Sequence, residues 1–174
     1  AKYAATRWAL PMVSVATSLA NDGVASPVAS LVNDGIKGSY GVHIPIAVIV
    51  DLDFVENGPE AVNRAGVGDV ISNISALADW ELARLTRNEP VDGLAASLAR
   101  MGAEAVLNAP GDMNDDGFVT VLAEALISSG LAMAVCGSSR PSSGGCHEIM
   151  HATDALYPNT ASHGELAGLG ALFC

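Results

Sequence analysis

The spacing of apolar residues changes near residue 56, and this change limits the folds open to the chain. Before it, segments 11–18 and 37–53 carry short apolar runs rich in Val and Ile, which predict β-strands. The near-continuous run of the second segment predicts burial on both faces. After residue 56, apolar residues recur at three- and four-residue spacing, as in amphipathic helices. We therefore predict an α/β part over residues 1–55 and an all-α part over residues 56–174.

Glycines are read as boundaries of the predicted helices. Gly66 and Gly68 interrupt the first helical pattern, and Gly130 ends the third as a C-cap. A further helix begins near Cys146, and the turn at 157–160 leads into another helix. The main helical patterns cover residues 59–88, 91–108, 117–130 and 147–157.

Charge and cysteine content exclude several classes of protein. Eight Lys and Arg against nineteen Asp and Glu give a net charge of −11, which disfavours binding to nucleic acid and to anionic membranes. No apolar run approaches the roughly 20 residues of a membrane-spanning helix, and the first residues do not resemble a signal peptide. Three cysteines without a CxxC motif indicate reduced thiols. We predict a cytoplasmic protein without membrane insertion.

Three of the four histidines stand close together in the sequence. His147 and His151 are four residues apart and would share one face of a helix, and His163 follows across the turn at 157–160. Imidazole is a favoured ligand of zinc and iron, and a catalytic metal site commonly takes three protein ligands. Asp69, an acid in a glycine-rich apolar segment at a predicted helix start, is the candidate third ligand. Taken singly, these residues also fit surface histidines and an N-capping aspartate.

Several segments resemble one known family. They are VSVATSLANDGVASPVAS, GVGDVISNISALADWELA, the SSRPSSG turn with its HxxxHA motif, and SHGELAGLG. In this order they resemble the glycerol-1-phosphate dehydrogenase family of the iron-containing alcohol dehydrogenase and dehydroquinate synthase-like superfamily. The resemblance implies the C-terminal part of a Rossmann-like nucleotide-binding domain in residues 1–55. It implies a helical metal- and substrate-binding domain in residues 56–174.

The resemblance also implies an activity and a metal site. The activity is the NAD(P)-dependent, metal-assisted interconversion of dihydroxyacetone phosphate and sn-glycerol 1-phosphate in polar-lipid synthesis. The metal, Zn²⁺ or another divalent ion such as Fe²⁺, would polarise the substrate oxygen. Asp69, His147 and His163 match the metal ligands, and Asp69 and His151 match catalytic positions.

Further residues are matched to substrate and cofactor. Asp22 is expected to bind substrate together with Asp69 and His151. Thr17, Ser18 and Ser26 fall where the family contacts the dinucleotide, NAD or NADP. The expected partner is a small phosphorylated triose or glycerol, and a homo-oligomer is left open.

Departures from the family pattern keep other interpretations open. The chain begins at AKYAATR, after the expected glycine-rich phosphate turn, and ends at GALFC, before the expected last helices. It therefore resembles an internal portion of a longer protein, with weak dinucleotide binding of its own. Asp69, in place of a glutamate, favours a dehydrogenase over a dehydroquinate synthase. A glycerol dehydrogenase-type polyol oxidoreductase and a non-catalytic metal-binding remnant remain alternatives.

Three residues near the histidines have open roles. Arg140 could neutralise a substrate phosphate, together with backbone N–H groups near the glycines of SSGG, or could cap nearby carbonyls. Glu165 could accept a hydrogen bond from an imidazole. Cys146 is expected to be a small buried helix residue.

Overall fold

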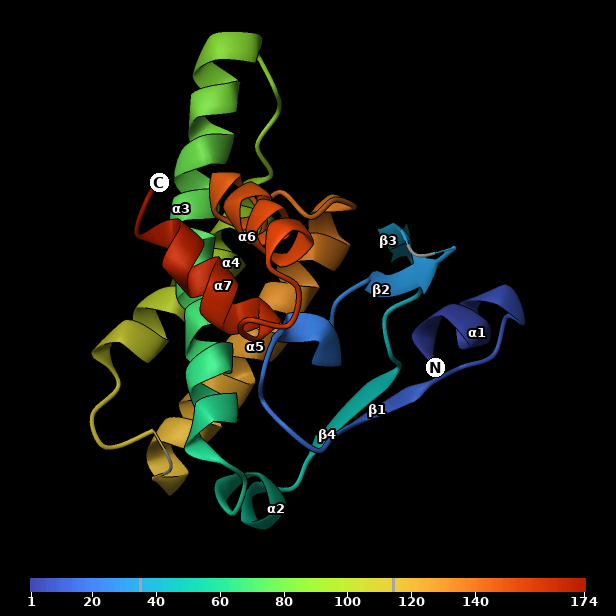
Figure 1. Cartoon of the computed structure of the whole chain (residues 1–174), viewed down its shortest axis with the longest axis vertical. Helices are drawn as coiled ribbons and strands as arrows, with labels where there is room; N and C mark the ends of the chain where they lie inside the picture. Colours follow the sequence, from blue (N-terminus) through green and yellow to red (C-terminus); the bar gives the residue numbers. More distant parts are fainter. Residues whose placement is uncertain (35, 114) are drawn as a thin grey trace.

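The computed structural model describes residues 1–34, 36–113 and 115–174, and its strands all lie in the first 50 residues. Figure 1 shows strands β1 and β4 and helix α1 to one side of a bundle of longer helices. The N-terminal elements are α1 (Lys2–Arg7), β1 (Val13–Ala16), the short 3-10 helix η1 (Asp22–Val24), β2 (Val28–Asn33), β3 (Ile36–Gly41), β4 (Ala47–Val50) and α2 (Leu52–Glu56). The long helices are α3 (Glu60–Arg87), α4 (Gly93–Asn108), α5 (Asp116–Cys136), α6 (Gly145–Leu156) and α7 (His163–Ala171).

The strands form two small sheets rather than one. Strands β1 and β4 pair in parallel, with Val13 opposite Ala47, and β2 and β3 form an antiparallel hairpin, with Ser30 opposite Ser39. The two strand segments predicted from the sequence are confirmed, the second as β3 and β4.

The predicted burial of β4 on both faces is wrong. Ile49 remains 52% exposed, and Val15 on the paired strand remains 60% exposed. Val13, Val15, Ala47 and Ile49 share the exposed face of this sheet, whereas Ala16 and Val50 on the other face contact the core.

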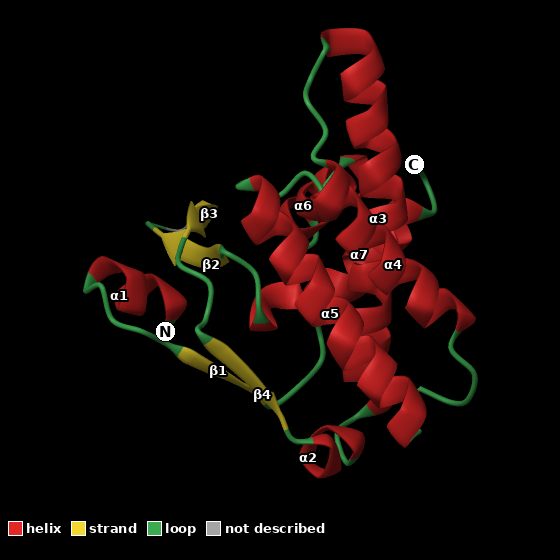
Figure 2. Cartoon of the chain, turned by 180° about the vertical axis from the view of Figure 1, so that it is seen from behind, coloured by secondary structure: helices red, strands yellow, loops and turns green. Residues whose placement is uncertain are grey.

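The long helices supply most of the core, and Ala16 and Val55 of the N-terminal elements complete it. Helix α5 packs against α4, and α3 packs against α4, α5, α6 and α7. Figure 2 shows the bundle from behind, with α5 crossing in front of the other helices. The largest core cluster includes Leu122 and Leu126, both fully buried, and a second cluster surrounds Trp80. The all-α character of the region after residue 56 is thus confirmed.

Glycines in α3 permit close contact between helices and do not interrupt the helix. Helix α3 runs through Gly66 and Gly68 for 28 residues, contrary to the sequence prediction. A Cβ on Gly68 would collide with the backbone oxygen of Gly164, and a Cβ on Gly164 would collide with the backbone oxygen of Ala65. Because only hydrogen occupies these positions, the backbones of α3 and α7 can nearly touch. This glycine contact brings the first turn of α7 against the N-terminal third of α3.

Gly130 has the same function in α5, so its predicted role as a C-cap is wrong. The helix continues to Cys136 and ends at Gly137, whose φ of 69° lies in the left-handed region. A Cβ on Gly130 would meet the backbone of Ala25 and Ser26 at 2.7 Å. Gly130 therefore lets the segment after η1 lie directly against α5.

Helix α5 is, among the described residues, the one helix long and apolar enough to cross a membrane, which the sequence analysis did not expect. More than half of its apolar window is buried inside the protein. Core helices of soluble proteins have the same composition, and α5 buries part of its apolar surface against α3 and α4. The division into domains at residues 55 and 56 stays a prediction.

Candidate metal and substrate site

Asp69, His147 and His163 come together although they belong to three different helices. Nε2 of His163 lies 3.4 Å from Oδ1 of Asp69, and Nε2 of His147 lies 3.9 Å from the same oxygen. The two imidazole rings have centroids 5.3 Å apart. One ligand atom from each residue can be chosen so that all three lie within 4.8 Å of one another. Two imidazole nitrogens and one carboxylate are a donor set suited to Zn²⁺ or Fe²⁺.

The position of each ligand follows from local structure. Asp69 lies in the interior of α3, not at a helix start as the sequence suggested, and is 4% exposed. His163 is the first residue of α7, whose N-terminus is held by the side chain of Ser162 in a capping box with Glu165. Glu165 therefore has a structural role, as its carboxylate accepts hydrogen bonds from the N–H and hydroxyl of Ser162.

Helix α6 is held at its start by a second carboxylate of α3. Oδ2 of Asp79 accepts a hydrogen bond of 2.5 Å from the N–H of Gly145, the first residue of α6. Because anions favour the N-terminus of a helix, this contact stabilises α6 and fixes its position along α3. His147 is thereby directed towards Asp69.

Burial keeps His147 in the form that binds metal. Removal of the imidazole from water lowers the pKa of His147 to about 4, and the opposing attraction of Asp69 only partly compensates. The ring is therefore neutral at pH 7, as a metal ligand must be. Its other nitrogen, Nδ1, lies 3.4 Å from Sγ of Cys146, which is fully buried as expected from the sequence.

Asp22 reaches the cluster from the N-terminal region. Its backbone N–H donates a hydrogen bond of 2.8 Å to Oδ2 of Asp69, and its own carboxylate accepts one of 2.9 Å from the hydroxyl of Ser129. Desolvation, followed by the negative charge of Asp69, raises the pKa of Asp22 to about 7. Asp22 can thus hold or release a proton near neutral pH.

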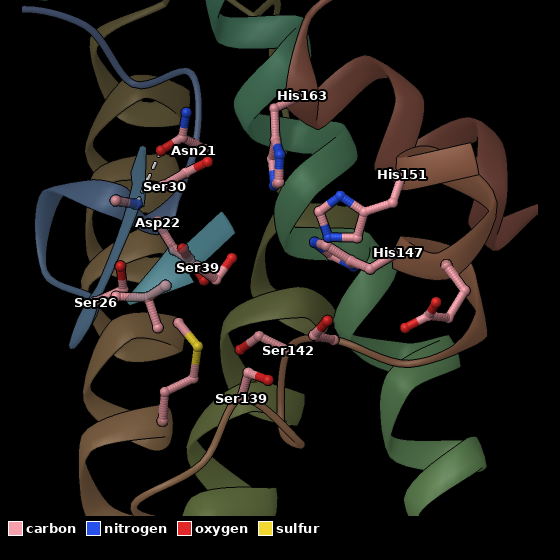
Figure 3. A pocket seen from close by; sticks show the side chains of 15 residues that line it. Asn21, Asp22, Ser26, Ser30, Ser39, Ser139, Ser142, His147, His151 and His163 are labelled. Atoms are coloured by element: carbon pink, nitrogen blue, oxygen red, sulfur yellow. Dashed lines mark hydrogen bonds between the residues drawn. The ribbon is translucent and has the colours of Figure 1, made fainter. Parts of the chain in front are cut away.

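A cavity of about 470 Å³ opens beside these residues. Figure 3 shows His147, His151 and His163 on one side of it, and Asp22, Ser26 and the hairpin serines on the other. His151 lies on the same helix as His147, as predicted. The lining residues are Asn21, Asp22, Gly23, Ser26, Val28, Ser30, Ser39, Met133, Ser139, Ser142, Ser143, His147, Glu148, His151 and His163. The volume suits a small polar molecule.

The three residues matched to dinucleotide binding do not share one cavity. Ser26 lines the cavity beside the histidines, whereas Thr17 and Ser18 line an adjoining hollow of about 280 Å³. Asn21 and Gly23 border both hollows. A ligand longer than a triose could therefore extend from one into the other around η1.

Arg140 is engaged away from this cavity. Its guanidinium donates two hydrogen bonds of 2.6 Å to the carboxylate of Glu89, in the bidentate geometry of a strong ion pair. The N–H of Gly145 is likewise occupied by Asp79. Arg140 therefore does not line the cavity, and of the N–H groups near these glycines that of Gly145 is already bonded. Among the described residues, no lysine or arginine lines the cavity.

Sequence reasoning missed four residues that organise the site: Lys2, Asn73, Asp79 and Ser129. The ammonium group of Lys2 donates to the backbone oxygens of Gly23 and Ser26, at 2.9 and 2.8 Å. Asn73 and Ser129 are polar residues within apolar helical segments, and both are about 1% exposed. A polar residue on the apolar face of a predicted helix indicates a buried hydrogen bond, but the sequence does not show which residue is the partner.

Comparison with known proteins shows which enzymes the chain resembles. Residues 1–59 match the iron-containing alcohol dehydrogenase family. The chain is 41% identical to the glycerol-1-phosphate dehydrogenase [NAD(P)+] of Methanosarcina barkeri over 174 residues, which are 99% of this chain and 49% of the relative. The corresponding protein of Sulfurisphaera tokodaii is 42% identical over 99% of this chain and 50% of its own length. The chain spans about half the length of these curated relatives.

Solved structures show the same fold. A probable glycerol dehydrogenase from Sinorhizobium meliloti superposes with a TM-score of 0.77 at 19% identity, covering 98% of this chain and 51% of that one. A glycerol dehydrogenase from Schizosaccharomyces pombe gives 0.75 at 20% identity, covering 99% and 46%. The match over residues 1–59 and the shared fold both relate the chain to the iron-containing alcohol dehydrogenase family. The curated relatives it resembles at about 40% identity are glycerol-1-phosphate dehydrogenases.

Proposed function

We propose that this chain carries the metal- and substrate-binding part of an enzyme that interconverts dihydroxyacetone phosphate and sn-glycerol 1-phosphate with NAD(H) or NADP(H). The observation that carries the proposal is the cluster of Asp69, His147 and His163 beside a polar cavity, in a chain 41% identical to such dehydrogenases. The reaction transfers a hydride between the nicotinamide ring and the C2 carbon of the triose, and a proton to or from its oxygen.

The three clustered residues would hold one divalent metal ion, Zn²⁺ or Fe²⁺. Such an ion supplies a Lewis acid for the substrate oxygen when bound. His147, which is buried and neutral at pH 7, and the carboxylate oxygens of Asp69 suit this role, because both side chains offer lone pairs. Asp69 is thus proposed to act in catalysis as a ligand.

Asp22 and His151 would bind the substrate. Both line the cavity, and they approach it from opposite sides in Figure 3. Their polar groups can hydrogen-bond hydroxyl groups of a triose, and a pKa near 7 allows Asp22 to exchange a proton there. Thr17, Ser18 and Ser26 are proposed to contact the dinucleotide along the adjoining hollow.

A phosphate-free polyol is the second candidate substrate, and one observation favours it. No lysine or arginine of the described residues lines the cavity, whereas phosphate groups are commonly bound by such side chains. Serine hydroxyls at residues 26, 30, 39, 139, 142 and 143 provide neutral donors instead. A phosphorylated substrate would therefore have to be bound through hydroxyl groups and the metal ion. A glycerol dehydrogenase would not need to bind a phosphate group.

The deciding experiment compares dihydroxyacetone phosphate with dihydroxyacetone in the full-length protein, supplied with Zn²⁺ and NADH or NADPH. We expect a higher kcat/KM for the phosphorylated ketone. A higher value for dihydroxyacetone would replace the proposal with a polyol dehydrogenase. Absence of turnover of both, in protein that binds one Zn²⁺ per chain, would support a non-catalytic metal-binding protein.

The metal assignment has its own test. Elemental analysis of the purified protein should give about one divalent ion per chain. His147→Ala and His163→Ala should each lose most of it, while His43→Ala, which changes a histidine outside the cluster, should retain it. Full occupancy in both cluster variants would contradict the assignment. As a folded-state ligand, the ion should also raise the unfolding temperature.

A further inference from the structure

The hydroxyl of Ser129 lies at the centre of a buried hydrogen-bond network beside the site. It donates to Oδ2 of Asp22 at 2.9 Å and accepts from Nδ2 of Asn73 at 3.1 Å. Its oxygen also lies 2.8 Å from the hydroxyl oxygen of Ser142, a residue of the cavity wall. The four residues come from η1, α3, α5 and the loop before α6, so one side chain connects four separate parts of the fold.

The hydrogen-bonding capacity of Ser129 is fully used. A serine hydroxyl has one proton to donate and two lone pairs to accept. The proton goes to Asp22, so the remaining contacts with Asn73 and Ser142 must be accepted bonds. Asn73 can only donate through Nδ2, and Ser142 then donates its own proton. The network therefore has one direction, from Asn73 and Ser142 through Ser129 to the carboxylate of Asp22.

Close packing against Gly130 fixes the position of the Asp22 segment along α5. Gly130 follows Ser129 and lets the backbone of Ala25 and Ser26 touch the helix. The ammonium group of Lys2 also holds this segment, by donating hydrogen bonds to the carbonyl oxygens of Gly23 and Ser26. The backbone N–H of Asp22 in turn donates to Asp69. A displacement of Asp22 would therefore disturb the hydrogen bond that holds Asp69, a residue of the metal cluster.

We propose that Ser129 is a positioning residue that fixes the Asp22 carboxylate against the cavity and, through the Asp22 N–H, orients Asp69. The inference rests on the proposed function for the substrate-binding role of Asp22. Ser129 itself touches neither the metal cluster nor, among the lining residues, the cavity. Its effect is transmitted entirely by Asp22.

The test compares Ser129→Ala with Ser128→Ala in the full-length protein. Ser128 precedes Ser129 on the same helix, but its hydroxyl donates to the carbonyl of Leu98 in α4, and Ser128 does not line the cavity. The first readout is Zn²⁺ affinity, measured by competition with a chelator. Loss of a residue that orients a ligand commonly weakens metal binding by about tenfold or more, and we expect this for Ser129→Ala. Ser128→Ala should leave Zn²⁺ affinity unchanged.

A double-variant cycle separates positioning from general damage. If Ser129 acts through Asp22, Ser129→Ala should weaken Zn²⁺ binding in the wild-type background and have no further effect in Asp22→Ala. An equal loss in both backgrounds would overturn the proposal. Ser129→Cys provides a variant of similar volume with a weak donor. Once circular dichroism shows it folded, it should still lose Zn²⁺ affinity, and wild-type affinity would also overturn the proposal.

The second readout is the steady-state kinetics with dihydroxyacetone phosphate. We expect a raised KM with a smaller change in kcat for Ser129→Ala, because substrate binding by Asp22 is disturbed while the hydride donor is untouched. An unchanged KM alongside weaker Zn²⁺ binding would overturn the substrate-positioning part of the proposal. If the wild-type enzyme does not turn over this substrate, the proposed function fails, and the Zn²⁺ cycle alone decides the role of Ser129.

Discussion

The strand pair β1–β4 and the bundle formed by α3 to α7 contain similar aliphatic residues, but these side chains are exposed in the first and buried in the second. Val15 and Ile49 on the strands are more than half exposed, whereas Leu122 and Leu126 on α5 are fully buried. The bundle has partners on several sides of each central helix, and each strand has one neighbour. Similar composition thus gives a closely packed core in one region, to which Ala16 and Val55 also contribute, and a sheet with one exposed face in the other. Stability and the metal site are both expected to depend chiefly on the bundle.

Truncation of the bundle core should have the largest effect. Leu126→Ala removes a fully buried side chain and should lower the free energy of unfolding by about 2–5 kcal/mol. Urea denaturation would measure this loss. Ile49→Ala, at a 52% exposed strand position, is the matched comparison and should cost much less. Equal losses at the two positions would contradict the contrast between the regions.

The glycine contact between α3 and α7 should be the next most sensitive feature. Gly68→Ala places a methyl group against the backbone of Gly164 and should destabilise the protein by about 1–3 kcal/mol. It should also weaken Zn²⁺ binding, because α7 carries His163. Gly117→Ala is the control, since nothing lies within 4 Å of its added Cβ. This control should be neutral or stabilising by up to about 1 kcal/mol through helix propensity.

The pH dependence of stability in the metal-free protein tests the shifted pKa values of His147 in the bundle and Asp22 in the N-terminal region. The pKa of His147 is lowered from 6.5 to about 4, so the unfolded chain binds more protons in that window, and stability falls as pH falls. The pKa of Asp22 is raised from 3.8 to about 7, so the folded chain binds more protons, and stability falls as pH rises. The two contributions oppose each other between pH 4 and 6.5.

Asp22→Asn removes one of these opposing contributions. Between pH 4 and 6.5, the unfolding free energy of this variant in the presence of a chelator should rise more steeply with pH than that of wild type. Denaturation series at several pH values would measure the slope. Asp53→Asn, at an exposed position in α2, should leave the slope as in wild type. A slope unaltered by Asp22→Asn would contradict the raised pKa.

The smallest effect is expected on the exposed surface of the sheet. Ile46, just before β4, is 71% exposed, and Ile46→Ser should change the free energy of unfolding by less than about 0.5 kcal/mol. Chemical denaturation would measure it. A loss comparable to that of Leu126→Ala would show that this surface is covered in solution.

Periodicity was sufficient to predict most elements but not their ends. The helix over 91–108 and the one starting near Cys146 follow directly from local spacing and turn residues. Gly66, Gly68 and Gly130 misled the prediction, because a glycine permits both a chain break and a close helix contact, and only the partner decides between them. The burial of β4 was also mispredicted, since local sequence does not state whether another element covers each face of a strand.

The site was partly accessible from sequence. The spacing of His147 and His151, with the HxxxHA motif, indicated a shared helix face, and the structure brings Asp69, His147 and His163 together. Ser129 and Asp79 could not be found in this way. Their contacts join residues separated by 107 and 66 positions, and each residue taken alone fits an ordinary helix. Arg140 was ambiguous for the same reason until its pairing with Glu89 was seen.

Helix α3 carries both Asp69, in the metal cluster, and Asp79, at the start of α6. These carboxylates are ten residues apart, or about 15 Å along the helix axis. Adding one residue between them would turn one carboxylate by about 100° relative to the other, so α6 could no longer satisfy both. Homologous chains should therefore keep this interval at constant length through evolution. Insertions and deletions should gather instead beyond Arg87, where the helix has ended.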